Sequence, residues 1–73
     1  MEGLTPGRIV YHVIAEGVHR PAIICHVENK EIGIVNLFTF YDVKNDGEGV
    51  KYTNDVYYSE EKLINTWHWI EKA

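Results

Sequence analysis

Residues 19–42 read HRPAIICHVENKEIGIVNLFTFYD, two runs of apolar and β-branched residues separated by the polar turn ENKE. Runs of this length and composition predict β-strands, and the short polar segment between them predicts a tight hairpin. We expect the first strand over Arg20–Glu28, with Pro21 near its beginning, where a missing N–H is tolerated. The second strand is expected over Ile32–Asp42. Its odd and even positions are both apolar, so we expect it to be largely covered on both faces.

Three further strands are expected around this hairpin. RIVYHVI, over Arg8–Ile14, follows the turn TPG, and TWHWI, over 66–70, lies near the end of the chain. VKYTNDVYY, over 50–58, follows the polar loop VKNDGEG and is expected to break at Asn54–Asp55. The segment Ser59–Leu63 begins with a good N-cap residue followed by two glutamates, which the helix dipole favours. We therefore expect one short helical turn there, before the last strand.

Five short strands at intervals of about 8–12 residues predict an all-β barrel or sandwich. With a helical turn before the last strand, the layout resembles SH3-like barrels, and residues 19–42 also resemble the middle hairpin of Tudor-like barrels. This resemblance implies a five-stranded antiparallel barrel in which the last strand pairs with the first. Seventy-three residues make a single domain, residues 1–73.

The composition narrows the classes of partner. Seven basic and eleven acidic residues give a formal net charge of −4, so the protein is a poor non-specific binder of double-stranded nucleic acid. No apolar run approaches the ~20 residues that span a bilayer. The start MEGLTPGR lacks a basic-then-apolar signal pattern, so we expect a cytoplasmic protein with no membrane partner. Domains of this size are marginally stable, so we also expect a homo-oligomer, most simply a symmetric dimer.

The sequence predicts neither a metal site nor an enzyme. The histidines are His12, His19, His26 and His68, and the single cysteine is Cys25. Cys25 and His26 are adjacent on a strand and point to opposite faces, so they cannot easily hold one ion. Cys25 lies within an apolar run, where we expect a buried and unreactive thiol. The chain has no nucleophile elbow, glycine-rich phosphate loop or zinc-protease motif, so no catalytic residue and no cofactor are expected.

The aromatic residues indicate a binding surface. The chain is richer in amphipathic rings than a small barrel can bury, and these rings are Tyr11, Tyr41, Tyr52, Tyr57, Tyr58, Trp67 and Trp69. They are either residues at the rim of the core or the lining of a groove or self-association face. The alternation Trp67-His68-Trp69 puts both indoles on one side of a strand and the imidazole on the other. We expect one side to close the core and the other to look onto a site.

The combination TPGRIVYHV, HRPAII, VNLFTFYD, NDG, YSEEK and TWHW resembles a group of short proteins encoded by tailed bacteriophages. The resemblance covers Thr5–Glu71. The sequence departs from the group's pattern where KLIN replaces a turn containing proline and glycine, and where WIEK replaces a Trp-Pro ending. The resemblance implies a phage origin and a small barrel, but no activity.

Two functions fit a small phage protein of this kind. In the first, it sequesters a nucleotide-derived immune signal without turnover, in a site between subunits: arginines contact phosphate, an indole stacks on a base and a histidine adds a hydrogen bond. If both indoles are buried, Tyr11, Tyr41 or Tyr52 would stack instead. The residues expected to bind this ligand are Arg8, His19, Arg20, Trp67, His68 and Trp69. In the alternative, the chain is a protein-interaction module that binds a host protein or belongs to the virion, with no small-molecule ligand.

Overall fold

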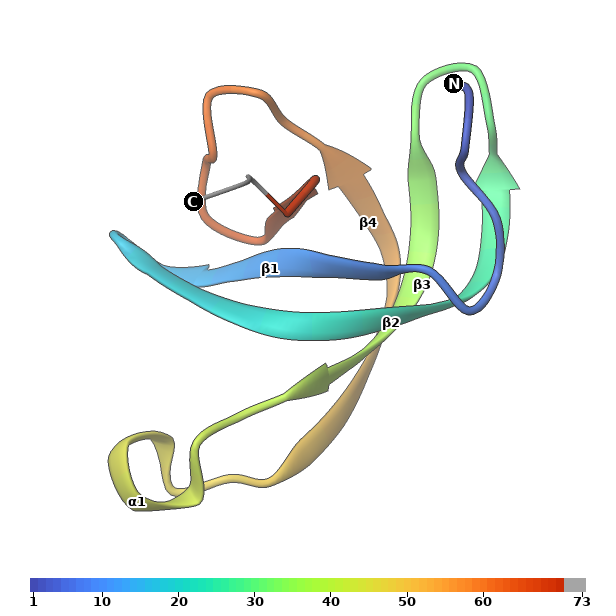
Figure 1. Cartoon of the computed structure of the whole chain (residues 1–73). Coiled ribbons are helices and arrows are strands. Elements are labelled where there is room, and N and C mark those ends of the chain that lie inside the picture. The colour runs from blue at the N-terminus through green and yellow to red at the C-terminus, as the bar shows by residue number, and fades with distance from the viewer. Residues whose placement is uncertain (71–73) are drawn as a thin grey trace.

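The computed structural model describes residues 1–70, and within them it contains five strands and one helical turn. In chain order these are β1 (Ile9–Ala15), β2 (Val18–Asn29), β3 (Ile34–Phe40), α1 (Val43–Asp46), β4 (Val50–Tyr58) and β5 (Thr66–His68). The strands pair in the order β1-β2-β3-β4-β5 and close into a barrel (Figure 1). The predicted all-β, five-stranded barrel is confirmed.

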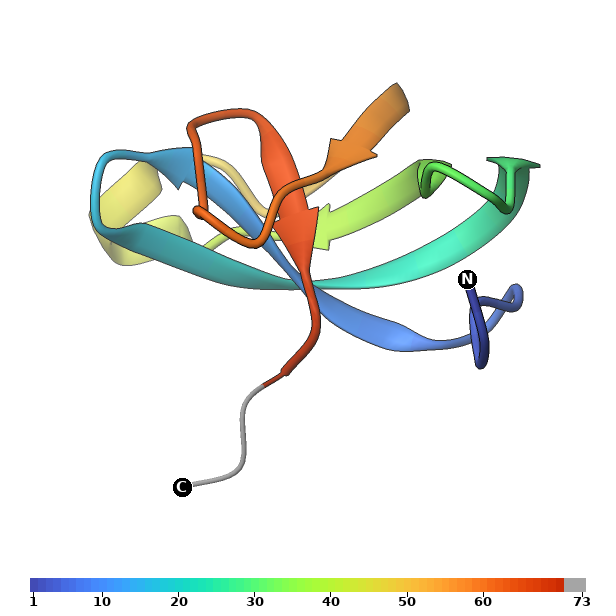
Figure 2. The same cartoon turned by 90° about the horizontal axis from the view of Figure 1, so that it is seen from above.

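The sheet is mixed, so the prediction of a wholly antiparallel barrel is wrong for one pair of strands. The β1–β2, β2–β3, β3–β4 and β1–β5 pairs are antiparallel, as is expected of strands joined by hairpins. The β4–β5 pair is parallel and short, with only Tyr57 opposite Thr66 and Tyr58 opposite Trp67. The cause is geometric, because a ring with an odd number of strands cannot alternate direction all the way round. β5 lies beside β1, as expected for the last strand (Figure 2).

The helical turn lies before β4 and not where the sequence predicted it. Ser59–Leu63 forms a turn in which the Lys62 N–H donates to the Ser59 carbonyl oxygen at 3.2 Å. Lys62 then adopts a left-handed backbone, with φ of 61°, which stops the helix after one turn. The helical residues are those of α1. Asp42 caps it by accepting the Lys44 N–H, and the left-handed Gly47 ends it.

The barrel interior holds a small apolar core around Trp67. The core residues are Leu4, Val10, Ala22, Ile24, Val35, Leu37, Val56 and Trp67. The Trp67 indole N–H donates to the Gly33 carbonyl oxygen at 2.7 Å, so its one polar atom is satisfied inside the core. The prediction that an indole of the last strand closes the core is therefore confirmed.

Two bulges decide which side chains face outward. In β4, Asn54 and Asp55 stand opposite the single residue Asn36, whose side-chain oxygen accepts the Asp55 N–H at 2.9 Å. This is the break expected at Asn54–Asp55, although β4 continues through it. In β2, the register passes from Ile24 to His26 and leaves Cys25 outside the ladder. Cys25 is therefore exposed, and the expectation of a buried thiol is wrong.

The prediction that β3 is largely covered on both faces is wrong for the second half of the strand, although the outward-facing Ile34 and Asn36 of the first half are half-buried and buried. Val35, Leu37 and Thr39 point into the barrel and are fully buried. Phe38 and Phe40 point outward and are exposed. In a barrel this small the apolar residues of the outer face have no second layer to cover them.

The two ends of the molecule carry different segments. α1 lies at one end, and the N-terminus lies at the other beside the β2–β3 hairpin, where the Met1 ammonium group donates to the Lys30 carbonyl oxygen at 2.7 Å (Figure 1). Within residues 1–70, no helix has the length and apolar character needed to cross a membrane.

Candidate functional site

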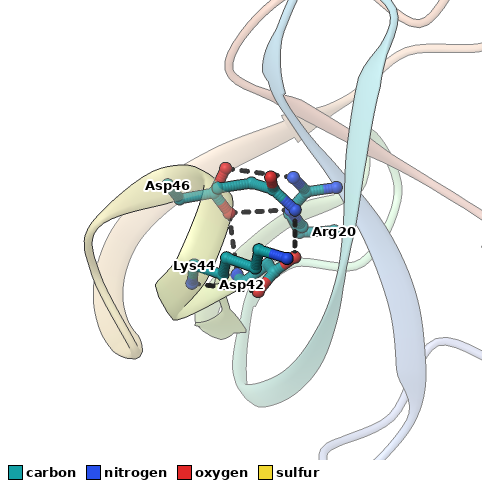
Figure 3. A network of polar contacts seen from close by, with 5 residues as sticks. Arg20, Asp42, Lys44 and Asp46 are labelled. Atoms are coloured by element: carbon teal, nitrogen blue, oxygen red, sulfur yellow. Dashed lines mark hydrogen bonds and ion pairs between the residues drawn. The ribbon is translucent and has the colours of Figure 1, made fainter.

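The six residues expected to bind a ligand lie in three places, of which the last two adjoin, and the first is the end of the barrel near α1. There the Arg20 guanidinium makes a bidentate contact with Asp46, with Nε to Oδ2 at 2.8 Å and Nη2 to Oδ1 at 3.0 Å (Figure 3). This hydrogen-bonded pair raises the pKa of Arg20 and holds the pKa of the Asp46 carboxyl below its ordinary value. Arg20 thus ties α1 to β2, and its charge is already paired with the Asp46 carboxylate.

The second place is the opposite end of β1, where Arg8 meets the indoles. The Arg8 guanidinium lies 5.0 Å from the centre of the Trp69 ring, a cation–π contact. Trp69 is half-buried and packs edge-on against Trp67, which is fully buried and cannot stack on a ligand. Arg8 lies opposite Ile24, four residues along β2 from Arg20, or about 13 Å at the rise of a strand. The two arginines therefore do not form one phosphate site.

The third place is a cluster of Tyr11, His19 and His68 on the outer side of the β5–β1–β2 ladder. The His68 Nδ1–H donates to the Trp69 carbonyl oxygen at 2.8 Å, because a carbonyl only accepts. His68 Nε2 is then an acceptor and takes the Nδ1–H of His19 at 2.6 Å. The Tyr11 ring packs against both imidazoles. His68 is 5% exposed, so the imidazole side of Trp67-His68-Trp69 is covered as well as the indole side.

A hollow of about 390 Å³ opens beside this cluster. It is lined by Tyr58, Glu60, Lys62, His68 and Trp69. Of the six residues expected to bind a ligand, only His68 and Trp69 reach it. Within residues 1–70, no three histidine, cysteine or acidic side chains gather in a way that could hold a metal ion.

A second feature of the surface is a row of apolar side chains that crosses four strands. Ile9 stands opposite Ile23, Ile23 opposite Phe38, and Phe38 opposite Tyr52. Cross-strand partners point to the same side of a sheet, so the row is continuous. Beside it, Phe40 stands opposite Val50. We call these six residues the apolar sheet face: Ile9, Ile23, Phe38, Phe40, Val50 and Tyr52.

The apolar sheet face is open to solvent. The exposed fractions are 52% for Ile9, 43% for Phe38, 40% for Phe40, 59% for Val50 and 51% for Tyr52, and Ile23 is half-buried. At about 200 Å² for a large apolar side chain, these five residues expose roughly 450 Å². A single patch of that size is at the level of the largest patches on monomeric proteins, which are often functional.

The apolar sheet face as a whole could not be predicted from the sequence, for a physical reason. The residues of the face come from β1, β2, β3 and β4, and they line up only because of the register in which these strands pair. The bulge at Asn54–Asp55 sets the register between β3 and β4, and hence places Tyr52 beside Phe38, with ring centres 5.4 Å apart. The alternation of Phe38 and Phe40 with buried residues in β3 was the signal that could have indicated an exposed face.

Comparison of the chain with protein-family models, curated proteins and solved structures finds no match. The phage origin and the SH3-like family therefore stay predictions from the sequence. What is established is a small, closed, five-stranded barrel with an apolar sheet face.

Proposed function

We propose that this protein is an interaction domain that binds another protein through the apolar sheet face. The observation that carries the proposal is the exposed row of apolar side chains across β1, β2, β3 and β4. Burying apolar surface contributes about 25 cal/mol per Å², so covering roughly 450 Å² would contribute on the order of 10 kcal/mol before the costs of association. Interface cores are enriched in aromatic residues, and Phe38, Phe40 and Tyr52 supply three.

The chemistry of the face selects the class of partner. None of its six side chains is acidic or basic, so the face offers no cation to a phosphate and no anion to a basic surface. Nucleic acids and nucleotides depend on such charges for affinity. The partner that fits is a protein surface that is itself apolar and uncharged.

A photo-crosslinking amino acid placed at position 38 tests this function in the cells that make the protein. The matched control places it at position 63, because Leu63 is also an exposed apolar residue, at 57%, but lies on the β4–β5 connection. We expect a discrete protein adduct from position 38 and none from position 63. The same adducts from both positions, or no adduct from position 38, would contradict the proposal.

A small nucleotide-derived ligand is a second candidate, supported by the hollow beside Trp69. Two aromatic rings, Tyr58 and Trp69, line it together with His68 and Lys62. Base stacking on such rings contributes about 1–3 kcal/mol per base. Glu60 also lines the hollow, and its carboxylate opposes a phosphate, so the candidate ranks below protein binding.

Calorimetry against cyclic dinucleotides, cyclic trinucleotides and ADP-ribose derivatives tests this candidate. Trp69→Ala is the matched variant, since Arg20 is held by Asp46 and would not report on the hollow. The candidate requires heat from at least one ligand with the wild-type protein and its loss in a folded Trp69→Ala variant. No heat from any ligand removes it.

A further inference from the structure

We propose that the partner of the apolar sheet face is a second copy of this chain, in a two-fold symmetric dimer. The proposal rests on the function given above, that this face binds a protein. In this dimer, two barrels would pack against each other through the outer sides of strands β1–β4.

The charge pattern favours a self-complementary contact. A two-fold interface places the same patch on both subunits, so groups near the axis meet copies of themselves. Any acidic or basic residue there would meet a like charge, which is destabilising. The six residues of the apolar sheet face carry no such group, although the chain as a whole has eleven acidic and seven basic residues. A two-fold contact centred on these six side chains would therefore bring no like charges together among them.

The row of apolar side chains could also pack against a facing sheet. Sheets pack face to face with their side chains interdigitating across a layer about 10 Å thick. In the row across the strands, Phe38 stands between Ile23 and Tyr52, so rings and branched side chains lie next to one another and offer apolar contacts to a facing copy.

The area is that of an interface core. A standard interface buries about 800 Å² on each partner, with an apolar centre and a polar rim. The exposed side chains of the apolar sheet face supply roughly 450 Å² of that area at the centre. The surrounding polar surface would supply the rim, and the chain is small enough that oligomerisation is a common source of added stability.

Sedimentation equilibrium of the purified full chain tests the dimer. From low to high micromolar concentration we expect the mass to rise from the chain mass of 8.5 kDa towards twice that value. Phe38→Asp should stay at the single-chain mass at every concentration, because it places two like charges near the axis. Leu63→Asp makes the same kind of change on an exposed residue outside the face and should still dimerise.

A second variant keeps the test decisive if Phe38→Asp does not fold by circular dichroism. Val50→Asp changes the most exposed residue of the face, at 59%, and should give the same loss of dimer. A wild-type protein that stays at 8.5 kDa overturns the second-copy inference, and so does a folded Phe38→Asp or Val50→Asp that still dimerises. If the crosslink at position 38 then captures a different protein, the proposed function survives without this inference; no adduct of any kind overturns both.

Discussion

His12 is a buried imidazole inside the barrel, 2% exposed. Its Nδ1 lies 2.7 Å from Thr39 Oγ1, and its Nε2 has no hydrogen-bond partner among residues 1–70. An unpartnered acceptor is less costly than an unpartnered N–H, so the proton of the neutral ring belongs on Nδ1. Protonating Nε2 would bury a charge with no acceptor, and burial accordingly lowers the pKa of His12.

This lowered pKa predicts a loss of stability on mild acidification. The unfolded chain binds a proton at His12 near its ordinary pKa of about 6.5, and the folded chain binds it only at lower pH. The neutral His12 imidazole therefore contributes fully to the free energy of unfolding above about pH 6.5, and this contribution is lost as the pH falls below that value. We expect the free energy of unfolding in urea to fall less between about pH 7 and about pH 5 in His12→Gln than in the wild type. An equal fall in both proteins would contradict this account.

The sequence predicted which residues of a strand share a side, but not which distant residues they contact. Alternation along the last strand predicted that one side of Trp67-His68-Trp69 closes the core, because side-chain direction on a strand has a period of two, and the structure shows that Trp67 does so. The partner of Arg20 lies 26 residues away in α1, and His19 and His68 are 49 residues apart. Contacts at such separations depend on how the strands register, which local pattern does not contain.

Gly33, in the turn of the β2–β3 hairpin, joins this hairpin to β4 and β5. Its carbonyl oxygen accepts the Tyr58 N–H at 3.0 Å and the Trp67 indole N–H at 2.7 Å. Gly33 has φ of 79°, and a Cβ built there would lie 2.8 Å from Tyr58 Cβ. One glycine therefore holds the hairpin against β4 and β5 at close range.

Gly33→Ala should destabilise the protein more than Gly17→Ala. Both glycines have positive φ, but Gly17 has open space where a Cβ would stand. The left-handed backbone alone costs about 1–2 kcal/mol for an L-residue, and we expect about that loss for Gly17→Ala. Gly33→Ala adds a steric clash with β4, so its urea midpoint should fall further. Equal midpoints for the two variants would show that the close approach at Gly33 is not structurally important.

The α1 turn is fixed to β2 by Asp46, which predicts an acid-sensitive contribution. Hydrogen bonding to Arg20 lowers the pKa of Asp46, so the folded chain keeps this carboxylate ionised at pH values where the unfolded chain protonates it. The ionised Asp46 carboxylate stabilises the folded chain above about pH 4, and this stabilisation disappears as the pH falls through the folded-state pKa of Asp46. Asp46→Asn should be less stable than the wild type at neutral pH, and the difference should shrink below about pH 4.

The matched control for Asp46→Asn is Glu48→Gln. Glu48 is exposed in the same loop, and its oxygen lies 3.9 Å from the Lys51 ammonium, a contact of little energetic value. Urea unfolding of this control should match the wild type at each pH. A difference for Asp46→Asn that persists unchanged in acid would mean that its charge is not what holds α1.

At the level of elements, the positions of the strands could be predicted from residue composition, but the conformations of the segments between them could not. β-branched runs between turn residues located all five strands, because that composition fits a pleated sheet. The helical turn was predicted at Ser59–Leu63 from one good cap residue, but the left-handed Lys62 ends it and the capped Asp42–Gly47 segment takes its place. The bulges opposite Asn36 and at Cys25 depend on pairing between strands, and they decide which residues are exposed.

At the scale of the whole molecule, closing the barrel divides the apolar residues into two sets. The inner set packs around Trp67, and part of the outer set forms the apolar sheet face, which has no second layer over it. A contiguous apolar patch of this extent is comparable to the largest patch on a typical monomer, and such patches are often functional. The function proposed here follows from that division, because a bound protein, in our proposal a second copy of the chain, would supply the missing layer.

Hydroxyl-radical footprinting of the wild-type protein, dilute and concentrated, tests this account most directly. The oxidation rates of Phe38 and Tyr52 are compared with that of Tyr57, which is equally exposed, at 54%, but lies outside the apolar sheet face at the other end of β4. We predict that Phe38 and Tyr52 become protected as the concentration rises, while Tyr57 reacts at an unchanged rate. Equal reactivity of all three residues at every concentration would show that the face stays open to water and would contradict the account.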